Sequence, residues 1–374
     1  MMNPAVDSAD YEQIFQQGLP LLDVRAPVEF AQGAFPGSVN LPLLDDKQRA
    51  LIGTCYKAAG QTAALDLGWS LLTPELKQQR QQQWLAFIKS HPNGLLYCFR
   101  GGLRSQIAQQ LIADAGGQIG RIPGGYKAMR RYLLLVLEGL ARDKYCVVVA
   151  GPACSGKTRL LAELPYALDL EGLAKHRGSA FGNLLASQPS QIDFENALAV
   201  AWLQLNPSGP WFVEDEGKLI GRCSLPSTLK ATLRNAPRVV LRETLSERIQ
   251  IAMQDYVRDK LQQFLQHYGD EGLNKFAEAL RRDLTAIKKR LGGLRYEGIL
   301  RKLNAAIAFL QRCDSMEMFP SVIEALLTDY YDPMYEYQHQ LNSGPIVMEG
   351  DRMAIKDWAM NYARQYGDAT EAMT

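Results

Sequence analysis

The sequence is short of the residues that build metal sites, and it has no apolar run long enough to cross a membrane. Its 374 residues include six cysteines and four histidines, and no two cysteines have the CxxC spacing of a zinc or redox motif. The most apolar stretches, residues 132–140 and 146–151, are far shorter than the roughly 20 residues of a membrane-spanning helix. The N-terminus has no basic segment before an apolar stretch, so it does not resemble a signal peptide. These absences predict a soluble, cytoplasmic protein with reduced thiols and no zinc site.

Neither positive nor negative side chains are in clear excess. Lys and Arg total 41 and Asp and Glu total 40, and a net charge of +1 by itself argues against a dedicated nucleic-acid-binding protein. The charges are unevenly distributed, however: residues 281–302 have eight basic and two acidic residues, whereas residues 314–374 have eleven acidic and three basic ones. The basic segment is either a solvated helix surface or a contact for RNA phosphates. The candidate RNA-binding residues in it are Arg281, Arg282, Lys288, Lys289 and Arg295.

Short apolar runs alternate with helical segments along most of the chain, which predicts parallel sheets covered by helices. Helices are expected over residues 74–90 and 124–144, and the pattern is mostly helical from about residue 246 to residue 309. The predicted fold class is α/β, with one parallel-sheet domain followed by a second α/β domain that has a helical extension. The buried strands are expected at residues 19–24, 39–43, 94–99, 145–151, 210–216 and 237–243.

A cysteine begins the loop between a predicted strand and a predicted helix, in the segment CFRGGLRS (98–105). In this setting the backbone N–H groups of a tight glycine-containing loop converge above the sulfur, with the positive end of the helix behind them. Such a cradle stabilises a thiolate or a bound anion. We therefore expect Cys98 to act as a nucleophile, and the alternative is a small buried residue at a strand end. The anion-binding candidates in the loop are Arg100, Gly101, Gly102 and Arg104.

A second loop, GPACSGKT (151–158), fits the pattern G-x-x-x-x-G-K-[ST] in full and lies between an apolar strand and a helix. In this phosphate loop, or P-loop, backbone N–H groups surround a diphosphate and Lys157 neutralises it. Thr158 is the candidate ligand for Mg²⁺. The diphosphate-binding candidates are Gly151, Ser155, Gly156, Lys157 and Thr158.

An acid that follows a second strand usually completes such a site. The strand expected at 210–216 ends in three acids, Glu214, Asp215 and Glu216, which are the candidates, and a plain solvated loop explains three adjacent acids equally well. His176, Arg177 and Ser179 lie at a predicted loop edge and are candidate phosphate contacts. The alternative for the histidine is a surface or packing position.

The segments around the cysteine loop resemble the rhodanese family. LLDVRAPVEFAQGAFPGSVNLPL (21–43) is similar to the family's Asp-Val-Arg and Pro-Gly-Ser-x-Asn-x-Pro signature, and IPGGYKAMRRY (122–132) is similar to its closing Gly-Gly-Tyr segment. The resemblance implies a rhodanese-like domain over residues 1–138 with Cys98 in its active-site loop. The stretch between residues 43 and 94 is longer than a minimal rhodanese domain needs. Residues 53–69 within it are expected to form a helix that ends near Gly68, and they could equally form a pocket wall.

The order of the two loops is more restrictive than either loop alone. Together with DLEGLAKHRGSAFG (169–182) and FVEDEGKLIG (212–221), it resembles the tRNA 2-selenouridine synthase family. The phosphate loop departs from the family form, which usually has Thr-Gly, at Ala153-Cys154. The resemblance implies a P-loop domain with the basic helical segment over residues 139–310, and an acidic C-terminal helical extension over residues 311–374.

This resemblance also implies an activity and its reactants. The enzyme would replace sulfur by selenium in wobble 2-thiouridine of tRNA using selenophosphate, through S-geranyl-2-thiouridine made from geranyl diphosphate. Selenophosphate and geranyl diphosphate would be co-substrates, with no tightly bound cofactor and with Mg²⁺ at Thr158. The implied partners are tRNA and a selenophosphate-producing enzyme, without a membrane.

Two other functions stay open from the sequence. One is an ATP-dependent sulfurtransferase, in which a rhodanese domain is coupled to a P-loop ATPase or kinase; measurement of ATP turnover distinguishes it. The other is a non-catalytic protein that binds tRNA or a partner. An unreactive Cys98 in thiol labelling at neutral pH would favour that function.

Overall fold

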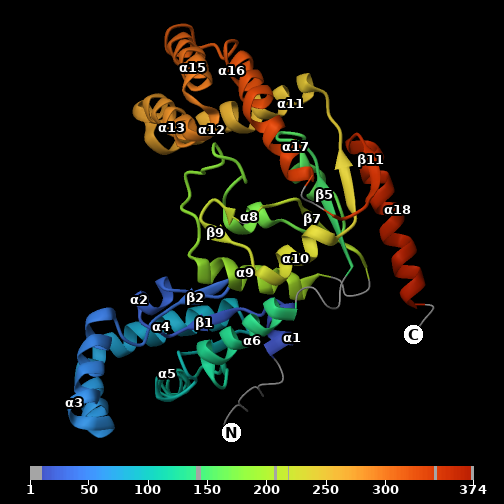
Figure 1. Cartoon of the computed structure of the whole chain (residues 1–374). Helices are drawn as coiled ribbons and strands as arrows, with labels where there is room; N and C mark the ends of the chain where they lie inside the picture. Colours follow the sequence, from blue (N-terminus) through green and yellow to red (C-terminus); the bar gives the residue numbers. More distant parts are fainter. Residues whose placement is uncertain (1–10, 140–144, 206–208, 218, 341–342, 372–374) are drawn as a thin grey trace. The chain divides into compact units, whose positions relative to one another are not determined.

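The computed structural model describes residues 11–139, 145–205, 209–217, 219–340 and 343–371 (Figure 1). The chain divides into two compact units, unit 1 with Met1–Glu138 and Ser190–Gln204, and unit 2 with Gly139–Pro189 and Leu205–Thr374. It therefore passes from one unit to the other three times. Each unit contains a parallel sheet covered by helices, so the predicted α/β class is confirmed.

Unit 1 is built on a four-stranded parallel sheet with the order β2-β1-β3-β4. The three strands expected in this part of the sequence are confirmed as β1, β2 and β3. The strands are β1 Leu21–Asp23, β2 Ser38–Asn40, β3 Leu95–Tyr97 and β4 Gly120–Arg121. The helices are α1 Tyr11–Gln16, α2 Pro27–Ala31, α3 Asp46–Leu71, α4 Pro74–Ser90, α5 Leu103–Asp114, α6 Gly125–Gly139 and α9 Gln191–Gln204.

The core of unit 1 forms because β1 and β3 are buried along their whole length. Leu22 and Leu96 from these strands pack with Trp84 of α4 and Ile112 of α5. Helix α4 has the limits predicted for it, since the Thr73 hydroxyl caps its first turn and a proline occupies its first position.

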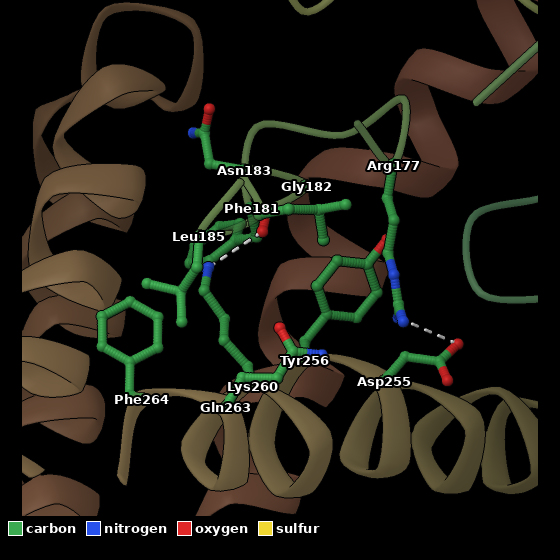
Figure 2. Close-up of a pocket in the computed structure, with 11 residues that line it drawn as sticks. Arg177, Phe181, Gly182, Asn183, Leu185, Asp255, Tyr256, Lys260, Gln263 and Phe264 are labelled. Atoms are coloured by element: carbon green, nitrogen blue, oxygen red, sulfur yellow. Dashed lines mark hydrogen bonds and ion pairs between the residues drawn. The ribbon is translucent and has the colours of Figure 1, made fainter. Parts of the chain in front are cut away.

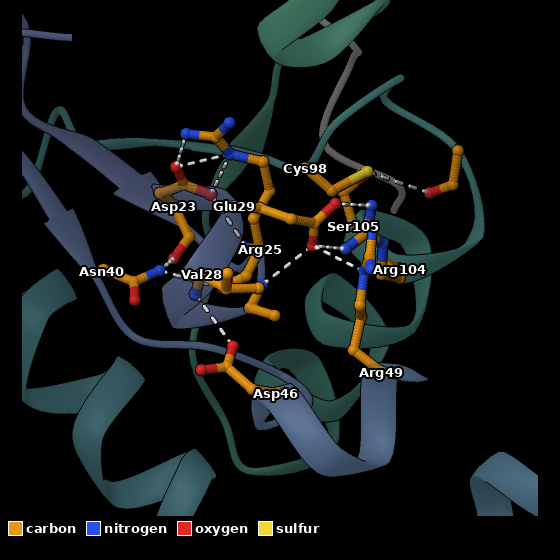
Figure 3. Close-up of polar contacts among 12 residues, drawn as sticks. Asp23, Arg25, Val28, Glu29, Asn40, Asp46, Arg49, Cys98, Arg104 and Ser105 are labelled. Carbon is orange, nitrogen blue, oxygen red and sulfur yellow. Dashed lines mark hydrogen bonds and ion pairs between the residues drawn. The ribbon is translucent and has the colours of Figure 1, made fainter. Parts of the chain in front are cut away.

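The two segments of unit 1 that resemble the rhodanese family, residues 21–43 and 122–132, form a buried polar framework (Figure 3). Asp23 and Arg25 are 0% and 1% exposed and pair at 2.7 Å. The Arg25 guanidinium lies 3.9 Å from the ring centroid of Tyr126, and the Asn40 amide donates to the carbonyl oxygens of Asp23 and Arg25 at 3.0 and 2.9 Å. These contacts join the first of the two segments to the second. Because both belong to one framework, a sequence that has one segment also has the other.

Helix α9 lies in unit 1, although the segments on both sides of it in the sequence belong to unit 2. Its Asn196 side chain donates to the carbonyl of Ala34 at 2.7 Å, and Gln204 donates to the carbonyl of Phe15 at 3.0 Å. Arg130 of α6 pairs with Glu195 of the same helix. The helix is therefore fastened to three separate parts of the unit.

Helix α3 contributes little to this core. Of its 26 residues, all within the described ranges, only Ala64 is buried. Gly60 has a non-helical backbone with φ +81°, so α3 consists of two helical arms joined at Gly60. The arms touch, because the Ile52 side chain lies 3.6 Å from where a Cβ on Gly68 would be. The single helix expected over 53–69 is therefore wrong in two respects: the backbone turns at Gly60, and the second arm continues to Leu71 rather than ending near Gly68.

Unit 2 is built on a five-stranded parallel sheet with the order β11-β10-β5-β7-β6 and a separate antiparallel pair, β8 and β9. The strands expected at 145–151, 210–216 and 237–243 are confirmed as β5, β7 and β10. The strands are β5 Cys146–Ala150, β6 Ala167–Leu168, β7 Trp211–Glu214, β8 Leu219–Ile220, β9 Cys223–Ser224, β10 Arg238–Leu241 and β11 Ile346–Gly350.

The helices of unit 2 fall into two groups. The helices α7 Lys157–Leu161, α8 Leu170–Ala174, α10 Ser227–Asn235 and α18 Arg352–Glu371 accompany the sheet. The helical region runs α11 Leu245–Ala252, η2 Met253–Arg258, α12 Asp259–Tyr268, η3 Gly269–Glu271, α13 Gly272–Ala286, α14 Lys288–Leu291, α15 Gly293–Cys313, α16 Phe319–Leu326, η4 Leu327–Tyr331 and α17 Asp332–Gln340.

The helical region has a core of its own, to which Phe276, Ile307 and Phe319 belong. It confirms the helical pattern expected from residue 246 to residue 309. The C-terminal segment is not wholly helical, because β11 extends the sheet and Ile355 of α18 packs with the sheet core.

Two expectations reach beyond the described residues. The helix expected over 124–144 is α6, and residues 140–144 lie outside the described ranges, as do residues 1–10 of the N-terminal segment. None of the helices in the described ranges combines the length and the apolar character that crossing a membrane requires.

Candidate functional site

The cysteine loop connects β3 to α5, as the sequence predicts. Cys98 is 2% exposed, and its Sγ donates to the Ser105 hydroxyl at 3.2 Å. That hydroxyl in turn donates to the carbonyl of Gly102, which caps α5. Ser105 was not singled out from the sequence. Its position in the first turn of the helix behind the cysteine is the signal that could have identified it.

Close backbone packing fixes the shape of the cysteine loop. Gly101 has φ +66°, and a Cβ there would lie 2.6 Å from the backbone nitrogen of Gly124. A Cβ on Gly125 would lie 2.2 Å from the carbonyl oxygen of Cys98, which accepts the N–H of Tyr126 at 2.9 Å. Only glycine fits these two positions.

The two arginines of the loop differ in their surroundings. Arg100 is exposed. Arg104 pairs with Glu29 at 2.5 Å, and the side chain of Arg49 lies 3.8 Å from the same carboxylate (Figure 3). Burial acts to raise the pKa of Glu29, but the hydrogen bond and charge of Arg104 hold that pKa below its usual range. The charge of Arg104 is therefore balanced, whereas Arg100 is exposed and forms no ion pair with any described residue.

The phosphate loop lies in unit 2 between β5 and α7, in the context that the motif requires. Gly156 has φ +84°, and a Cβ on Gly151 would lie 2.8 Å from the Ser155 hydroxyl. The Lys157 ammonium donates to the carbonyls of Gly151 and Pro152 at 2.9 and 3.2 Å. Among the described residues the buried Ser155 hydroxyl has no hydrogen-bond partner. The loop thus has a cation and a buried polar group directed to the same small space.

Arg248 of α11 holds the phosphate loop from outside. This arginine is 6% exposed, and its Nε donates to the carbonyl of Ala153 at 2.9 Å. Its Nη1 donates to Asp332 of α17 at 3.1 Å. The loop is in this way connected to the helical region. Arg248 was missed from the sequence, since nothing near it in the chain distinguishes it from other arginines.

Three carboxylates gather beside the phosphate loop, from Glu171, Glu214 and Glu216. Each has an oxygen within 4.8 Å of the others, and the Thr158 hydroxyl donates to Glu171 at 3.2 Å. Burial, followed by repulsion from Glu171, raises the pKa of Glu214 well above its usual range and the pKa of Glu216 to about 8. Neither Glu214 oxygen has a hydrogen-bond partner within the described part of the chain. We call these three residues the carboxylate cluster.

The cluster differs from the expected set. Asp215, a candidate from the sequence, instead pairs with the buried Arg238 at 2.7 Å. Side chains alternate along a strand, which explains why Glu214 and Glu216 share a side and Asp215 does not. Glu171 was not predicted. It lies in the first turn of α8, three residues after the short strand β6.

The other candidate phosphate contacts have partners within unit 2. His176 is 6% exposed and forms a bridge with Asn183, and burial lowers its pKa. Arg177 lies 3.4 Å from the Asp255 carboxylate and 5.4 Å from the ring centroid of Tyr256 (Figure 2). The hydroxyl of Ser179 donates to that of Tyr256 at 3.4 Å. Of these residues, Arg177, Asn183, Asp255 and Tyr256 border a cavity of about 10 Å³, which has room for about one water molecule.

A larger hollow of about 310 Å³ lies at the phosphate loop. Ser155, Gly156 and Arg159 border it on the loop side, and its other walls are mainly polar. Those walls come from Glu243, Ser246, Glu247, Gln250, Ile251 and Arg352.

The basic segment lies on α13, α14 and α15 and is exposed. The guanidinium of Arg281 donates to Asn304 at 2.9 Å, and the ammonium of Lys288 lies 4.9 Å from the ring centroid of Tyr296. These contacts leave most of the charge at the surface. The exposed basic residues are Arg281, Arg282, Lys288, Lys289, Arg290, Arg295, Arg301 and Lys302.

Known proteins match the chain over both units. Residues 144–366 match the family model described as the tRNA 2-selenouridine synthase AAA domain, and residues 7–131 match the rhodanese-like domain. The tRNA 2-selenouridine synthases of Hahella chejuensis, Marinobacter nauticus and Pseudomonas fluorescens are 48%, 45% and 44% identical to it. The matches cover 94% of this chain in each case, and 94%, 97% and 98% of the relatives. With two sites that correspond to the two matched domains, the chain belongs to the tRNA 2-selenouridine synthase family.

Proposed function

We propose that the chain is an enzyme that replaces sulfur by selenium in wobble 2-thiouridine of tRNA, with selenophosphate as the selenium donor and S-geranyl-2-thiouridine as the intermediate. Relatives named tRNA 2-selenouridine synthase, matched over nearly their whole length, support the overall reaction. The proposal assigns the geranyl step to one loop and the selenium step to the other. The observation that supports this assignment is that the chain has a phosphate loop and, in a separate glycine-containing loop, a buried cysteine. Such an enzyme works in the cytoplasm, where tRNA is modified.

The phosphate loop would hold the diphosphate of geranyl diphosphate. Lys157, which now donates to carbonyls of its own loop, would turn to the diphosphate, and the Ser155 hydroxyl and the loop N–H groups would donate to it. The sulfur of the nucleobase then attacks C1 of the geranyl group. A C–S bond forms, the C1–O bond breaks, and the diphosphate leaves with its charge balanced by the loop. The N3 proton of the base is released.

A divalent cation fits the carboxylate cluster. The Glu214 carboxyl is buried without a hydrogen-bond partner among the described residues, and the neighbouring carboxylates repel its charged form. A cation bound there would reduce this electrostatic repulsion. Thr158, Glu171, Glu214 and Glu216 are the residues that would hold it. Mg²⁺ supplies neutralisation of a diphosphate when it is bound at such a site. Diphosphate binding by the loop itself depends on Lys157 and the backbone.

The cysteine loop would serve the selenium step. Geranylation turns the sulfur into a better leaving group: the selenium of selenophosphate attacks C2 of the base, a C–Se bond forms, the C2–S bond breaks and geranyl thiol leaves. Water then cleaves the Se–P bond and releases phosphate. Cys98 would assist this displacement, with Arg100 attracting the selenophosphate anion. The Ser105 hydroxyl, now an acceptor for the thiol, would stabilise the thiolate by donating to it instead.

The exposed basic residues of α13, α14 and α15 would bind phosphates of the tRNA. Their charge is suited to a contact that does not depend on sequence. Selenophosphate is unstable in water, so a selenophosphate-producing enzyme is the natural second partner. Weakening of tRNA binding by salt should decrease when Lys288 and Lys289 are replaced by Ala.

The test is nucleoside mass spectrometry of tRNA incubated with the purified chain. Wild type should convert 2-thiouridine to the geranylated and then the selenated nucleoside. Lys157→Ala should block geranylation but still accept pre-geranylated tRNA, whereas Cys98→Ser should geranylate and stop there. Full geranylation by Lys157→Ala would refute the role of the phosphate loop, and full selenation by Cys98→Ser would refute that of the cysteine.

One observation favours a second candidate, an ATP-dependent sulfurtransferase. The hollow at the phosphate loop is bordered by Glu243, Ser246 and Gln250, which suit the polar part of a nucleotide better than a geranyl chain. This candidate predicts ATP turnover that depends on Lys157. The main proposal predicts geranyl transfer without ATP.

A further inference from the structure

The two arms of α3 expose large side chains that the core of unit 1 does not use. Leu51, Tyr56 and Trp69 are 55%, 58% and 50% exposed. A helix usually owes its stability to one face packed on the core, whereas α3 has only Ala64 buried among its described residues. Exposed aromatic rings on such a projecting segment indicate contact with a partner. We call Leu51, Tyr56, Lys57 and Trp69 the α3 patch.

The contact between the arms fixes how far along the arms these side chains lie. Because Ile52 touches Gly68, Trp69 is level with Leu51 in the paired helices. Tyr56 lies five residues further toward the turn at Gly60, which is about 7.5 Å at the rise of a helix. The patch therefore extends along the arms for about the distance that separates two bases of a stack when one further base would fit between them.

Open space adjoins the tyrosine. Gly53 is one helical turn before Tyr56 on the same arm, and a Cβ there would meet nothing within 4 Å. Glycine inside a helix costs about 1 kcal/mol relative to alanine, and no contact of the described structure requires it at this position. The bare backbone lets a partner approach the helix closely beside the ring.

The base of the arms is joined to the cysteine loop (Figure 3). Asp46 at the start of α3 accepts the N–H of Val28 at 2.8 Å. Arg49, one turn further on, lies 3.8 Å from the Glu29 oxygen that also pairs with Arg104 of the cysteine loop. A substrate held at Cys98 is thus close to the base of the arms, and its neighbouring groups can reach the α3 patch.

We propose that the α3 patch binds unpaired bases of the tRNA anticodon loop, next to the wobble nucleotide that enters the cysteine loop. This rests on the proposed function, which brings a single-stranded RNA loop to Cys98. Unpaired bases are recognised by stacking on aromatic side chains with basic residues beside them. Tyr56 and Trp69 supply the rings, and the exposed Lys47, Arg49 and Lys57 outnumber the acids of α3, Asp46 and Asp66. An aromatic and basic surface that continues from the site of reaction fits RNA.

Binding of an anticodon stem–loop RNA to the full chain tests this, by fluorescence anisotropy with labelled RNA. Trp69→Ala and Tyr56→Ala should each weaken binding about 5- to 100-fold, the effect of losing one base–aromatic stack. They should raise KM for tRNA and leave kcat unchanged at saturating tRNA. Trp69→Phe should keep most of the affinity because it keeps a ring. Tyr337→Ala is the matched control, since Tyr337 is 64% exposed on α17.

Unchanged RNA affinity in Trp69→Ala and Tyr56→Ala, with unchanged thermal unfolding, would overturn the inference. So would a defect confined to assays in which a protein delivers the selenium, because the patch would then bind that protein. The proposed function fails differently. In that case wild type binds the RNA and loses affinity on Trp69→Ala, but the nucleoside acquires neither a geranyl group nor selenium.

Discussion

Replacing Arg248 by methionine should weaken diphosphate binding although the side chain lies outside the phosphate loop. The arginine donates to the carbonyl of Ala153 at 2.9 Å and pairs with Asp332. A buried hydrogen bond from a charged group contributes about 1.5–3 kcal/mol. The Asp332 side chain is 29% exposed, so the ion pair adds at most about 1 kcal/mol. An ordered loop is needed for binding, so loss of the hydrogen bond to Ala153 should raise the dissociation constant about 10- to 150-fold.

Calorimetric titration of the full chain with magnesium pyrophosphate measures this effect. Arg248→Met should show the whole loss, whereas Asp332→Asn should lose less than about fivefold because the contact with Ala153 persists. Binding by Arg248→Met within twofold of wild type would refute the argument that this contact orders the loop. Equal losses in both variants would show that the ion pair matters rather than the contact with the loop.

Three further predictions concern stability. Because the folded-state pKa of Glu29 lies below its ordinary 4.5, the ion pair with Arg104 stabilises unit 1 above that pH and this contribution is lost as the pH falls through the lower value; urea titrations should show the loss, and Glu29→Gln should abolish it. Because the folded-state pKa of Glu214 lies well above its ordinary 4.5, this carboxyl destabilises the fold at neutral pH, and Glu214→Gln should raise the thermal midpoint there without Mg²⁺ and reduce the further rise on adding Mg²⁺; an undiminished rise would contradict the cation site. A fragment of residues 1–138 lacks α9 and should unfold at lower urea than the same fragment with residues 190–204 appended by a flexible linker; equal midpoints would show that α9 is dispensable.

The strands and helices of the fold were largely predictable because their signals are local. Buried strands such as β5 and β10 are short apolar runs between turn residues, and α4 begins at a Thr-Pro pair that defines its first turn. Strand β11 was missed for a physical reason. It lies at the edge of the sheet with most of its side chains exposed, and its apolar run, Ile-Val-Met, is only three residues long.

The loops of the site were predictable to a similar extent, but their partners were not. The phosphate loop and the cysteine loop are each a single continuous segment of the sequence. The structure places each of them between a strand and a helix. Glu171 and Arg248 lie on other elements and reach the phosphate loop only through tertiary folding, with contacts across 13 and 95 residues of chain. The choice of Glu216 over Asp215 could have been made from the alternation of side chains along β7.

The placement of α9 has a consequence for the order in which the protein is made. Unit 1 lacks one of its helices until residue 204 has been synthesised, and by then β5, the phosphate loop and β6 have already left the ribosome. At 5–20 residues per second the interval after residue 138 is roughly 3–13 s. During it the incomplete first unit and the unfinished second sheet coexist on one nascent chain. The two halves of this enzyme therefore mature together, and a gene for either half alone would encode an unfinished protein.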